Sequence, residues 1–283
     1  MTIAVVTPTG NVGSRVLQLL VQAGMRPRVL ARDPSRLKFR DLDVRQGDLL
    51  DAGFVADALK GADALFWATP ENFGTPDPQA DMETMGANAA AAGVPRIVQI
   101  SSIGAERRHG AGLIDGLARN EDQFASSGAD VLTLRCGNYF TNLMGSLDSL
   151  RTGTLKTTMR PDHRMPWVDP RDVAEVAAVR LLAANWSGHK VTAVHGPADL
   201  SWDEVAATIG AAVGRPITVE EITDEAMAAT LRAEGMSDKA ITGVVSMPAG
   251  VRDNFRPEQP RDLLTTTPTT LDAWAYENLR PLL

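Results

Sequence analysis

Two glycines three residues apart, Gly10 and Gly13, stand between a short apolar segment ending at Val6 and a helical pattern carried by Val16 and Leu20. Glycine lets a backbone turn approach a ligand closely, and the first turn of a helix offers unpaired N–H groups to an anion. This strand–turn–helix arrangement is typical of the site that holds the pyrophosphate of a dinucleotide. We therefore predict cofactor contacts from five consecutive residues: Thr9, Gly10, Asn11, Val12 and Gly13.

Thr7 occupies the position where such a loop usually has a further glycine for the tight turn that leaves the strand. Threonine is β-branched and poorly suited to a positive φ angle. We include Thr7 among the cofactor-binding residues, and two consequences of the replacement stay open. The loop geometry and the affinity for the cofactor are altered, or the protein has lost the cofactor.

A basic residue follows the second predicted strand, Arg28-Val29-Leu30. About twenty residues after the glycines, an acidic side chain would hold the ribose 2′-hydroxyl of NAD(H), whereas a basic one suits the 2′-phosphate of NADP(H). Arg32, with Arg36 and Lys38 close behind it, favours NADP(H). Two alternatives stay open: Asp33 binds the ribose, or Arg32 is an ordinary solvated charge.

Composition excludes several classes of protein. A net charge of −7 and a pI near 5.2 argue against a nucleic-acid-binding surface. Cys136 is the single cysteine and the chain has 4 histidines, so we expect neither an intrachain disulfide nor a metal site. No apolar run reaches the roughly 18 residues of a membrane span, and no leader sequence follows Met1. We expect a cytoplasmic protein.

Apolar segments alternate with helical patterns through the first two thirds of the chain. The expected strands are 43–47, 62–68, 96–100, 130–135 and 190–194, and the expected helices include 77–92, 120–126 and 173–184. This alternation predicts an α/β fold, a Rossmann-type doubly wound parallel sheet with helices on both faces.

After Pro197 the pattern changes to three helices, at 202–213, 224–234 and 271–279. We therefore divide the chain into an NAD(P)-binding Rossmann domain, residues 1–195, and a smaller, mainly helical C-terminal region, residues 196–283. The smaller region is expected to close over the carboxyl edge of the sheet on the substrate side.

Several segments together resemble the NmrA-like atypical short-chain dehydrogenase/reductase family, nearly from end to end. They are the loop 7–13, Arg32, Gly47-Asp48, Ser101-Ser102, the segments 135–142 and 167–174, and the tail 200–216. The resemblance implies that Asp48 contacts the adenine of the cofactor. It also implies an NAD(P)H-dependent activity, because the family includes reductases of quinones, azo compounds and imines.

Further candidates follow the later strands. The loop containing Ala68 and Thr69 should lie beside the ribose of the cofactor. Ser101 should line the nicotinamide site, with Ser102 on the substrate side. The alternative is that the two serine hydroxyls bond to local backbone. Three more substrate-binding candidates are Tyr139, Asn142 and His163. The competing interpretations are that Tyr139 packs a hinge between the two regions and that His163 is a solvated loop residue.

The Tyr-x-x-x-Lys pair of the wider dehydrogenase superfamily is not visible, since counting back from Asn120-Glu121 places Leu113 and Leu117 there. Reduction of an isolated ketone needs a positioned proton donor, which is commonly worth roughly 100-fold to 10,000-fold in rate. A quinone, an iminium or an activated alkene needs the acid less. These electrophiles are therefore the favoured acceptors, with the proton supplied by water or by Tyr139.

The leading hypothesis is an NADPH-dependent oxidoreductase that transfers hydride to a small apolar or aromatic electrophile, with specialised metabolism as one setting. One alternative is a protein that senses NADP(H) and regulates a partner protein, as some NmrA-like proteins do, since such a protein needs no catalytic pair. The other is a non-redox enzyme on the same fold, for which Thr7 is the clue. Only the first hypothesis requires the cofactor to be consumed.

Overall fold

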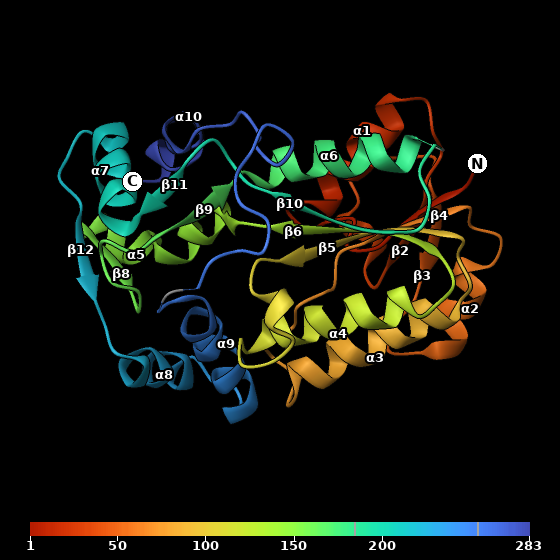
Figure 1. Cartoon of the computed structure of the whole chain (residues 1–283), viewed down its shortest axis with the longest axis horizontal. Helices are drawn as coiled ribbons and strands as arrows, with labels where there is room; N and C mark the ends of the chain where they lie inside the picture. Colours follow the sequence, from red (N-terminus) through yellow and green to blue (C-terminus); the bar gives the residue numbers. More distant parts are fainter. Residues whose placement is uncertain (184, 254) are drawn as a thin grey trace.

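A seven-stranded sheet runs through the larger of two lobes (Figure 1). The computed structural model describes residues 1–183, 185–253 and 255–283. Every pair of neighbouring strands in this sheet is parallel. In spatial order the strands are β10 (His189–Val194), β6 (Asp130–Cys136), β5 (Arg96–Ser102), β4 (Ala64–Trp67), β1 (Ile3–Val5), β2 (Arg28–Ala31) and β3 (Asp43–Gln46). The order proceeds outward from β1 in both directions, which confirms the doubly wound Rossmann-type fold.

Alternate residues of β1 enter two separate hydrophobic clusters, one on each face of the sheet. Ile3 and Val5 pack with Val16 and Leu20 on one face of the sheet. Ala4 belongs to the cluster on the other face. A strand buried on both faces needs apolar residues at every position, because its side chains alternate. This is why the segment reads as a continuous apolar run.

Two helices cover one face of the sheet and three cover the other (Figure 1). The first layer contains α1 (Gly13–Gln22) and α6 (Pro170–Leu182), and the second contains α2 (Ala52–Leu59), α3 (Pro78–Ala91) and α4 (Leu113–Ala125). Helix α4 begins seven residues earlier than the predicted 120. Two glycines with positive φ, Gly110 and Gly112, precede its first turn and obscure its start in the sequence. No helix of the described ranges is long and apolar enough to cross a membrane.

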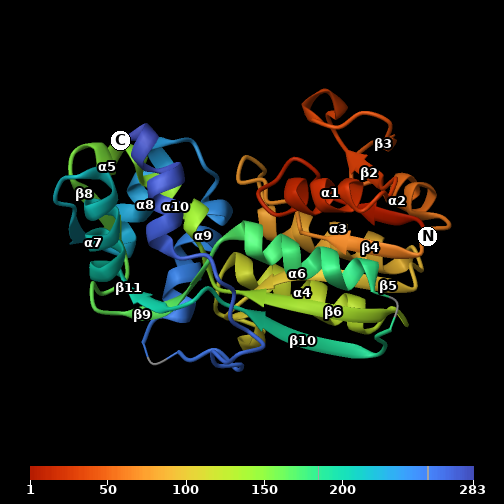
Figure 2. The ribbon, with the colours of Figure 1, turned by 90° about the horizontal axis from the view of Figure 1, so that it is seen from above.

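The smaller lobe contains two short sheets and a set of helices (Figure 2). One sheet has the order β11-β9-β7 and the other pairs β12 with β8. The strands are β7 (Asn138–Tyr139), β8 (Thr154–Thr157), β9 (Arg164–Val168), β11 (Asp199–Ser201) and β12 (Thr218–Glu221). The helices are α5 (Leu147–Arg151), α7 (Trp202–Val213), α8 (Asp224–Ala233), α9 (Asp238–Val251) and α10 (Leu271–Asn278). Short 3₁₀ turns complete the described chain at Pro34–Arg36, Ala105–Arg107, Phe140–Ser146 and Arg280–Leu282.

This lobe is assembled from two separate stretches of chain, because β8 pairs with β12 and β9 pairs with β11. Its core joins Phe140 and Trp167 from the first stretch to Ile209 and Trp274 from the second. The small strands were not predicted. Strands of two to five residues carry little periodic signal, and here most of their partners lie tens of residues away.

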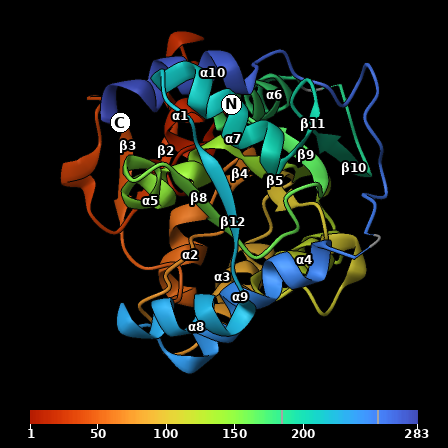
Figure 3. The ribbon, with the colours of Figure 1, turned by 90° about the vertical axis from the view of Figure 1, so that its left-hand side faces the viewer.

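Helix α9 was also missed, because it contains Gly243, Pro248 and Gly250, which are poor helix formers. It lies against α3 and α4, and Figure 3 shows it beside α8 at the end of the lobe to which β12 leads. The contact with the loop before α4 is very close. A Cβ atom at Gly250 would lie 2.5 Å from Cα of Ala111.

Replacement of Gly250 by alanine tests this contact. Alanine at an open helical position raises stability by about 1 kcal/mol relative to glycine. At Gly250 the added methyl group meets backbone that has no room to yield, so Gly250→Ala should instead lower the free energy of unfolding by roughly 1–3 kcal/mol. Denaturant unfolding measures the change, and its sign decides whether α9 is packed this tightly.

Candidate functional site

A cleft of about 1340 Å³ lies at the carboxyl edge of the parallel sheet. Its walls include the turn after β1, the loop at 68–73 after β4 and the end of β5, together with residues of β8 and α9 from the smaller lobe. Strands β1 and β4 are neighbours, and the chain leaves them toward opposite edges of the sheet. This is the topological switch point at which doubly wound sheets bind ligands.

The structure brings nearly all of the residues predicted for the site to this cleft. Its lining includes Thr7, Thr9, Gly10, Asn11, Val12, Gly13, Arg32, Asp48, Ala68, Thr69, Ser101, Ser102, Tyr139 and Asn142. His163 is the exception and does not line the cleft. It is partly buried, and this burial, followed by the charge of Arg160, lowers the pKa of its imidazole.

The tight turn after β1 forms with Thr7 in it. Thr7 adopts φ of 49°, in the left-handed region that costs a non-glycine residue roughly 1–2 kcal/mol. Its hydroxyl shares its one proton between the carbonyls of Val6, at 2.8 Å, and Ala68, at 3.1 Å. Its own carbonyl accepts from the N–H of Gly10 at 3.0 Å. These hydrogen bonds hold the strained residue and tie the turn to the loop after β4.

Helix α1 begins directly at this turn without a side-chain cap. Most of the longer helices have one, supplied by Asp51, Asp77, Asp169, Ser201, Thr223, Ser237 and Thr270. The first turn of α1 also has no acidic residue. The N–H groups of Ser14 and Arg15 donate to the carbonyls of Gly10 and Val12, but no such bond engages those of Asn11, Val12 and Gly13 within the described residues. These three N–H groups and the positive end of the helix dipole are therefore available to an anion in the cleft.

Basic side chains lie at the end of the cleft formed by the loops after β2 and β3. Arg32 and Arg36 line it, and Arg32 is exposed. Among the described residues, no carboxylate lies within salt-bridge distance of either guanidinium. The carboxylate of Asp33 accepts from the N–H and the hydroxyl of Ser35, at 3.0 and 2.6 Å, and these bonds lower its pKa. Asp33 is thus occupied as a helix cap.

The hydroxyl groups of Thr69 and Ser101 are both engaged inside the protein. Thr69 accepts from the indole N–H of Trp67 at 2.9 Å and donates to the Asn120 amide oxygen at 2.8 Å. Ser101 donates to the Glu121 carboxylate at 2.6 Å. The Ser102 hydroxyl donates to the carbonyl of Ile103 at 2.9 Å. It thus bonds to local backbone, which is the alternative to a ligand contact that the sequence left open.

Tyr139, Cys136 and Glu71 form a group of titratable side chains on the cleft wall. Burial raises the pKa of the Cys136 thiol to about 12. Burial also raises the pKa of the Tyr139 phenol well above its usual value, and the nearby Cys136 and Glu71 add to this shift. Loss of solvent raises the pKa of Glu71. The phenol therefore stays protonated at neutral pH and is able to donate a proton.

The remaining wall is apolar, and sequence reasoning missed most of it. Five of the ten methionines line the cleft, namely Met85, Met159, Met165, Met227 and Met247. Further apolar lining residues are Phe73, Leu113, Ile114, Leu117, Trp202, Val244, Pro248 and Val251. Methionine adapts to ligands of different shape because its side chain is unbranched and polarisable. No local pattern points to these residues, because they come from elements far apart in the sequence.

The fold and the cleft together define a dinucleotide-binding protein of the Rossmann type, with an uncapped helix N-terminus and an apolar chamber beside it. Comparison with known proteins gives the family. Residues 8–182 match the model of a family described as NAD(P)H-binding. The chain belongs to this family of NmrA-like atypical short-chain dehydrogenases/reductases and binds NAD(P)H.

Two curated relatives are similar to most of the chain. A (4-alkanoyl-5-oxo-2,5-dihydrofuran-3-yl)methyl phosphate reductase from Streptomyces griseus is 33% identical over 82% of this chain and 81% of its own length. An NAD(P)H azoreductase from Xenophilus azovorans is 30% identical over 83% and 82%. The crystal structure of an Escherichia coli NADPH-dependent quinone oxidoreductase in complex with NADPH has the same fold. Its TM-score is 0.80 at 23% identity, over 98% of this chain and 99% of that one.

The two glycines of the loop should respond differently to alanine. A Cβ atom at Gly13 would lie 2.2 Å from the Thr7 carbonyl oxygen, so Gly13→Ala should lower the free energy of unfolding by roughly 2–3 kcal/mol. A Cβ atom at Gly10 would lie 3.4 Å from the same oxygen, an ordinary contact. Gly10→Ala should leave stability within about 0.5 kcal/mol of the parent and weaken NADPH binding about 10-fold or more.

Thermal unfolding and calorimetric titration separate the two effects. Equal loss of stability in both variants would contradict the distinction between a packing glycine and a ligand glycine.

Proposed function

We propose that the protein is an NADPH-dependent reductase that transfers hydride to a small, apolar, electrophilic acceptor such as a quinone, an imine or an activated alkene. The observation that carries the proposal is the position of Leu113 and Leu117. Both line the cleft at the start of α4. Counting back from Asn120-Glu121 assigns to them the positions of the catalytic tyrosine and lysine of the wider superfamily. Apolar side chains at these positions neither donate a proton nor adjust the pKa of a donor.

The chemistry of the acceptor follows from this arrangement. Hydride adds two electrons and one hydrogen to the acceptor, and one further proton completes the reduction of a quinone or an activated alkene, whereas an iminium needs none. A quinone gives a hydroquinone anion and an iminium gives a neutral amine, so neither product is as basic as an alkoxide. Water in the open cleft or the protonated phenol of Tyr139 supplies the proton that a quinone requires.

The apolar chamber supports an aromatic or extended apolar acceptor. Three of its methionines lie on helices, and the other two lie on a strand or just after one. Because methionine side chains are flexible, they are able to adjust to ligands of different outline. The relatives point to the same class, since their names specify reduction of an azo compound, a quinone and an unsaturated furanone. We propose that this chain also reduces a conjugated acceptor.

The preference for NADPH rests on Arg32 and Arg36, which offer charge-assisted hydrogen bonds to a 2′-phosphate. Arg32→Ala should weaken NADPH binding about 10-fold to 100-fold, the range that a charged hydrogen bond contributes, and leave NADH nearly unchanged. Arg40 is an exposed arginine on the same segment that does not line the cleft, so Arg40→Ala is the control. Calorimetric titration with both cofactors measures the effect. Equal weakening of NADPH and NADH would exclude Arg32 as the phosphate ligand.

Tyr139→Phe tests the source of the proton. With a quinone we expect this variant to lose only several-fold in rate. In the parent protein the rate should stay flat between about pH 6 and pH 9, because the phenol, with its raised pKa, remains protonated over this range. The other tyrosine, Tyr276, is exposed and provides the control Tyr276→Phe. A rate that instead falls with rising pH would identify the Glu71 carboxyl as the donor, since desolvation raises the pKa of this carboxyl.

A steady-state assay with NADPH and a panel of quinones, imines and azo dyes tests the function itself. Oxidation of NADPH that depends on one of these acceptors supports the reductase. Tight binding of NADPH without turnover of any acceptor would favour a protein that senses the cofactor.

A further inference from the structure

Ser101 stands at the carboxyl end of β5 in the cleft, and its hydroxyl is committed to an internal partner. It is 2% exposed and donates its only proton to the Glu121 carboxylate at 2.6 Å. A hydroxyl whose proton is used in this way keeps only acceptor capacity for a ligand. Glu121 on α4, which accepts this proton, therefore determines whether Ser101 acts as a hydrogen-bond donor or acceptor toward the cleft.

Glu121 is an ionised carboxylate held by two arginines. Arg135 grips it with two hydrogen bonds, from Nε at 3.0 Å and from Nη2 at 2.8 Å, and Arg108 adds a third at 2.7 Å. Burial alone would raise the pKa of Glu121, but these hydrogen bonds and charges lower it. An ionised carboxylate accepts hydrogen bonds and never donates them, so Ser101 must be the donor in its hydrogen bond with Glu121.

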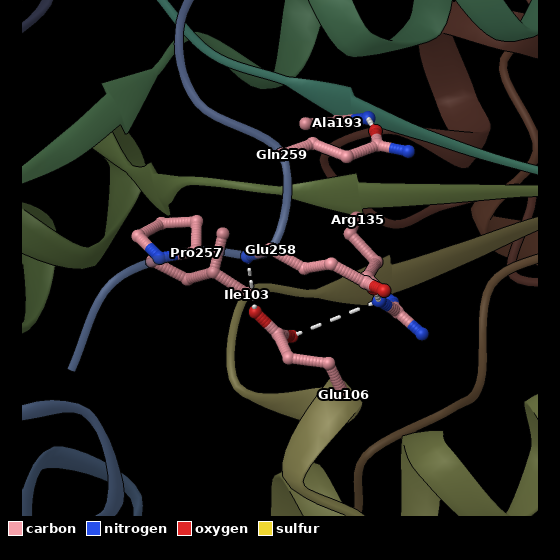
Figure 4. Close-up of a pocket in the computed structure, with 7 residues that line it drawn as sticks. All are labelled: Ile103, Glu106, Arg135, Ala193, Pro257, Glu258 and Gln259. Atoms are coloured by element: carbon pink, nitrogen blue, oxygen red, sulfur yellow. Dashed lines mark hydrogen bonds and ion pairs between the residues drawn. The ribbon is translucent and has the colours of Figure 1, made fainter.

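Arg135 is in turn fixed from the other side by the C-terminal strap, which we define as residues 255–267. Its Nη1 donates to the Glu258 carboxylate, while Glu106 accepts from the backbone N–H of Glu258 at 3.0 Å (Figure 4). Within the strap, Pro257 and Pro260 flank Glu258 and Gln259 and favour an extended backbone there. Consecutive side chains of an extended segment point to opposite sides, so Glu258 reaches Arg135 and Gln259 reaches β10.

Gln259 fastens the strap to the free edge of the sheet. Its amide oxygen accepts from the N–H of Ala193, and its NH₂ group donates to the carbonyl of Val191 at 2.8 Å. Beyond it, the N–H of His195 donates to the Thr265 carbonyl at 2.8 Å. The strap is thus held independently of Glu258, and loss of the Glu258 side chain should leave it docked.

We propose that Glu121, Arg135 and Glu258 are positioning residues that orient the Ser101 hydroxyl as a hydrogen-bond acceptor for the nicotinamide–ribose half of the bound cofactor. The chain runs from the partly exposed Glu258 through Arg135 and Glu121 to the cleft wall, and each link is an ion pair or a charge-assisted hydrogen bond. The complementary group on the cofactor is an N–H or O–H donor. This inference rests on cofactor binding in the cleft and is independent of which acceptor is reduced.

Binding measurements on three variants test the proposal. Ser101→Ala removes the acceptor but leaves Glu121 with its three arginine hydrogen bonds, so no buried charge is left without a partner. Glu258→Ala releases the outer end of the chain at a side chain that is 63% exposed. The third variant combines both substitutions. Asp148→Ala, which removes the partner of Arg151 in an exposed pair of the smaller lobe, is the control.

Two ligands separate the halves of the cofactor: NADPH, and adenosine 2′,5′-bisphosphate, which lacks the nicotinamide–ribose half. Ser101→Ala should weaken NADPH about 10-fold and Glu258→Ala about 3-fold, with the bisphosphate and the melting temperature nearly unchanged. In the double variant, Glu258→Ala should add nothing to the effect of Ser101→Ala, because its influence passes through that hydroxyl.

Three results would overturn the proposal. They are an unchanged NADPH affinity in Ser101→Ala, a double variant in which the two effects multiply, and an equal loss of affinity for the bisphosphate. Because turnover is not measured, these results stand apart from the choice of acceptor, which the steady-state assay decides.

Discussion

The close approach of helix α1 to the turn after β1 is the constraint on which the site depends. Only a hydrogen atom fits at Gly13, since a Cβ atom there would lie 2.2 Å from the Thr7 carbonyl oxygen. This contact aims the uncapped N-terminus of α1 at the switch point of the sheet. A side-chain cap in this place would occupy the N–H groups that an anion needs. The most local feature of the fold therefore sets where the edge of the sheet offers N–H groups to an anion.

The two halves of the cleft follow different physical principles. The half lined by the loop 7–13 and by Arg32 and Arg36 offers backbone N–H groups and arginines without carboxylate partners among the described residues. These groups would suit any ligand with complementary negative charge. The other half relies on apolar contact with methionines, which recognise shape and area with little directional bonding. A fixed cofactor site beside an adaptable chamber suits reductases that share a hydride donor and differ in their acceptors.

Glu121 and Arg135 form a buried ion pair beside the cleft. Glu121 and Arg135 are almost fully buried, and each is satisfied by several hydrogen bonds. Removal of either one would leave the other with fewer hydrogen bonds in a medium of low dielectric constant, so the pair contributes specificity of geometry more than net stability. Its place between the strap and Ser101 links the last part of the chain to the cleft wall.

The sequence by itself determined the parallel sheet, the glycine-containing turn after β1 and the basic residue after β2. These features are local, because strand alternation, glycine spacing and the residue beyond a strand are all readable within about thirty residues. Only the tertiary structure decided that residues 138–168 join the later chain in the smaller lobe, that α9 supplies part of the apolar chamber, and that Glu258 meets Arg135. Such contacts join positions many tens of residues apart, and only the packing of the whole chain brings them together.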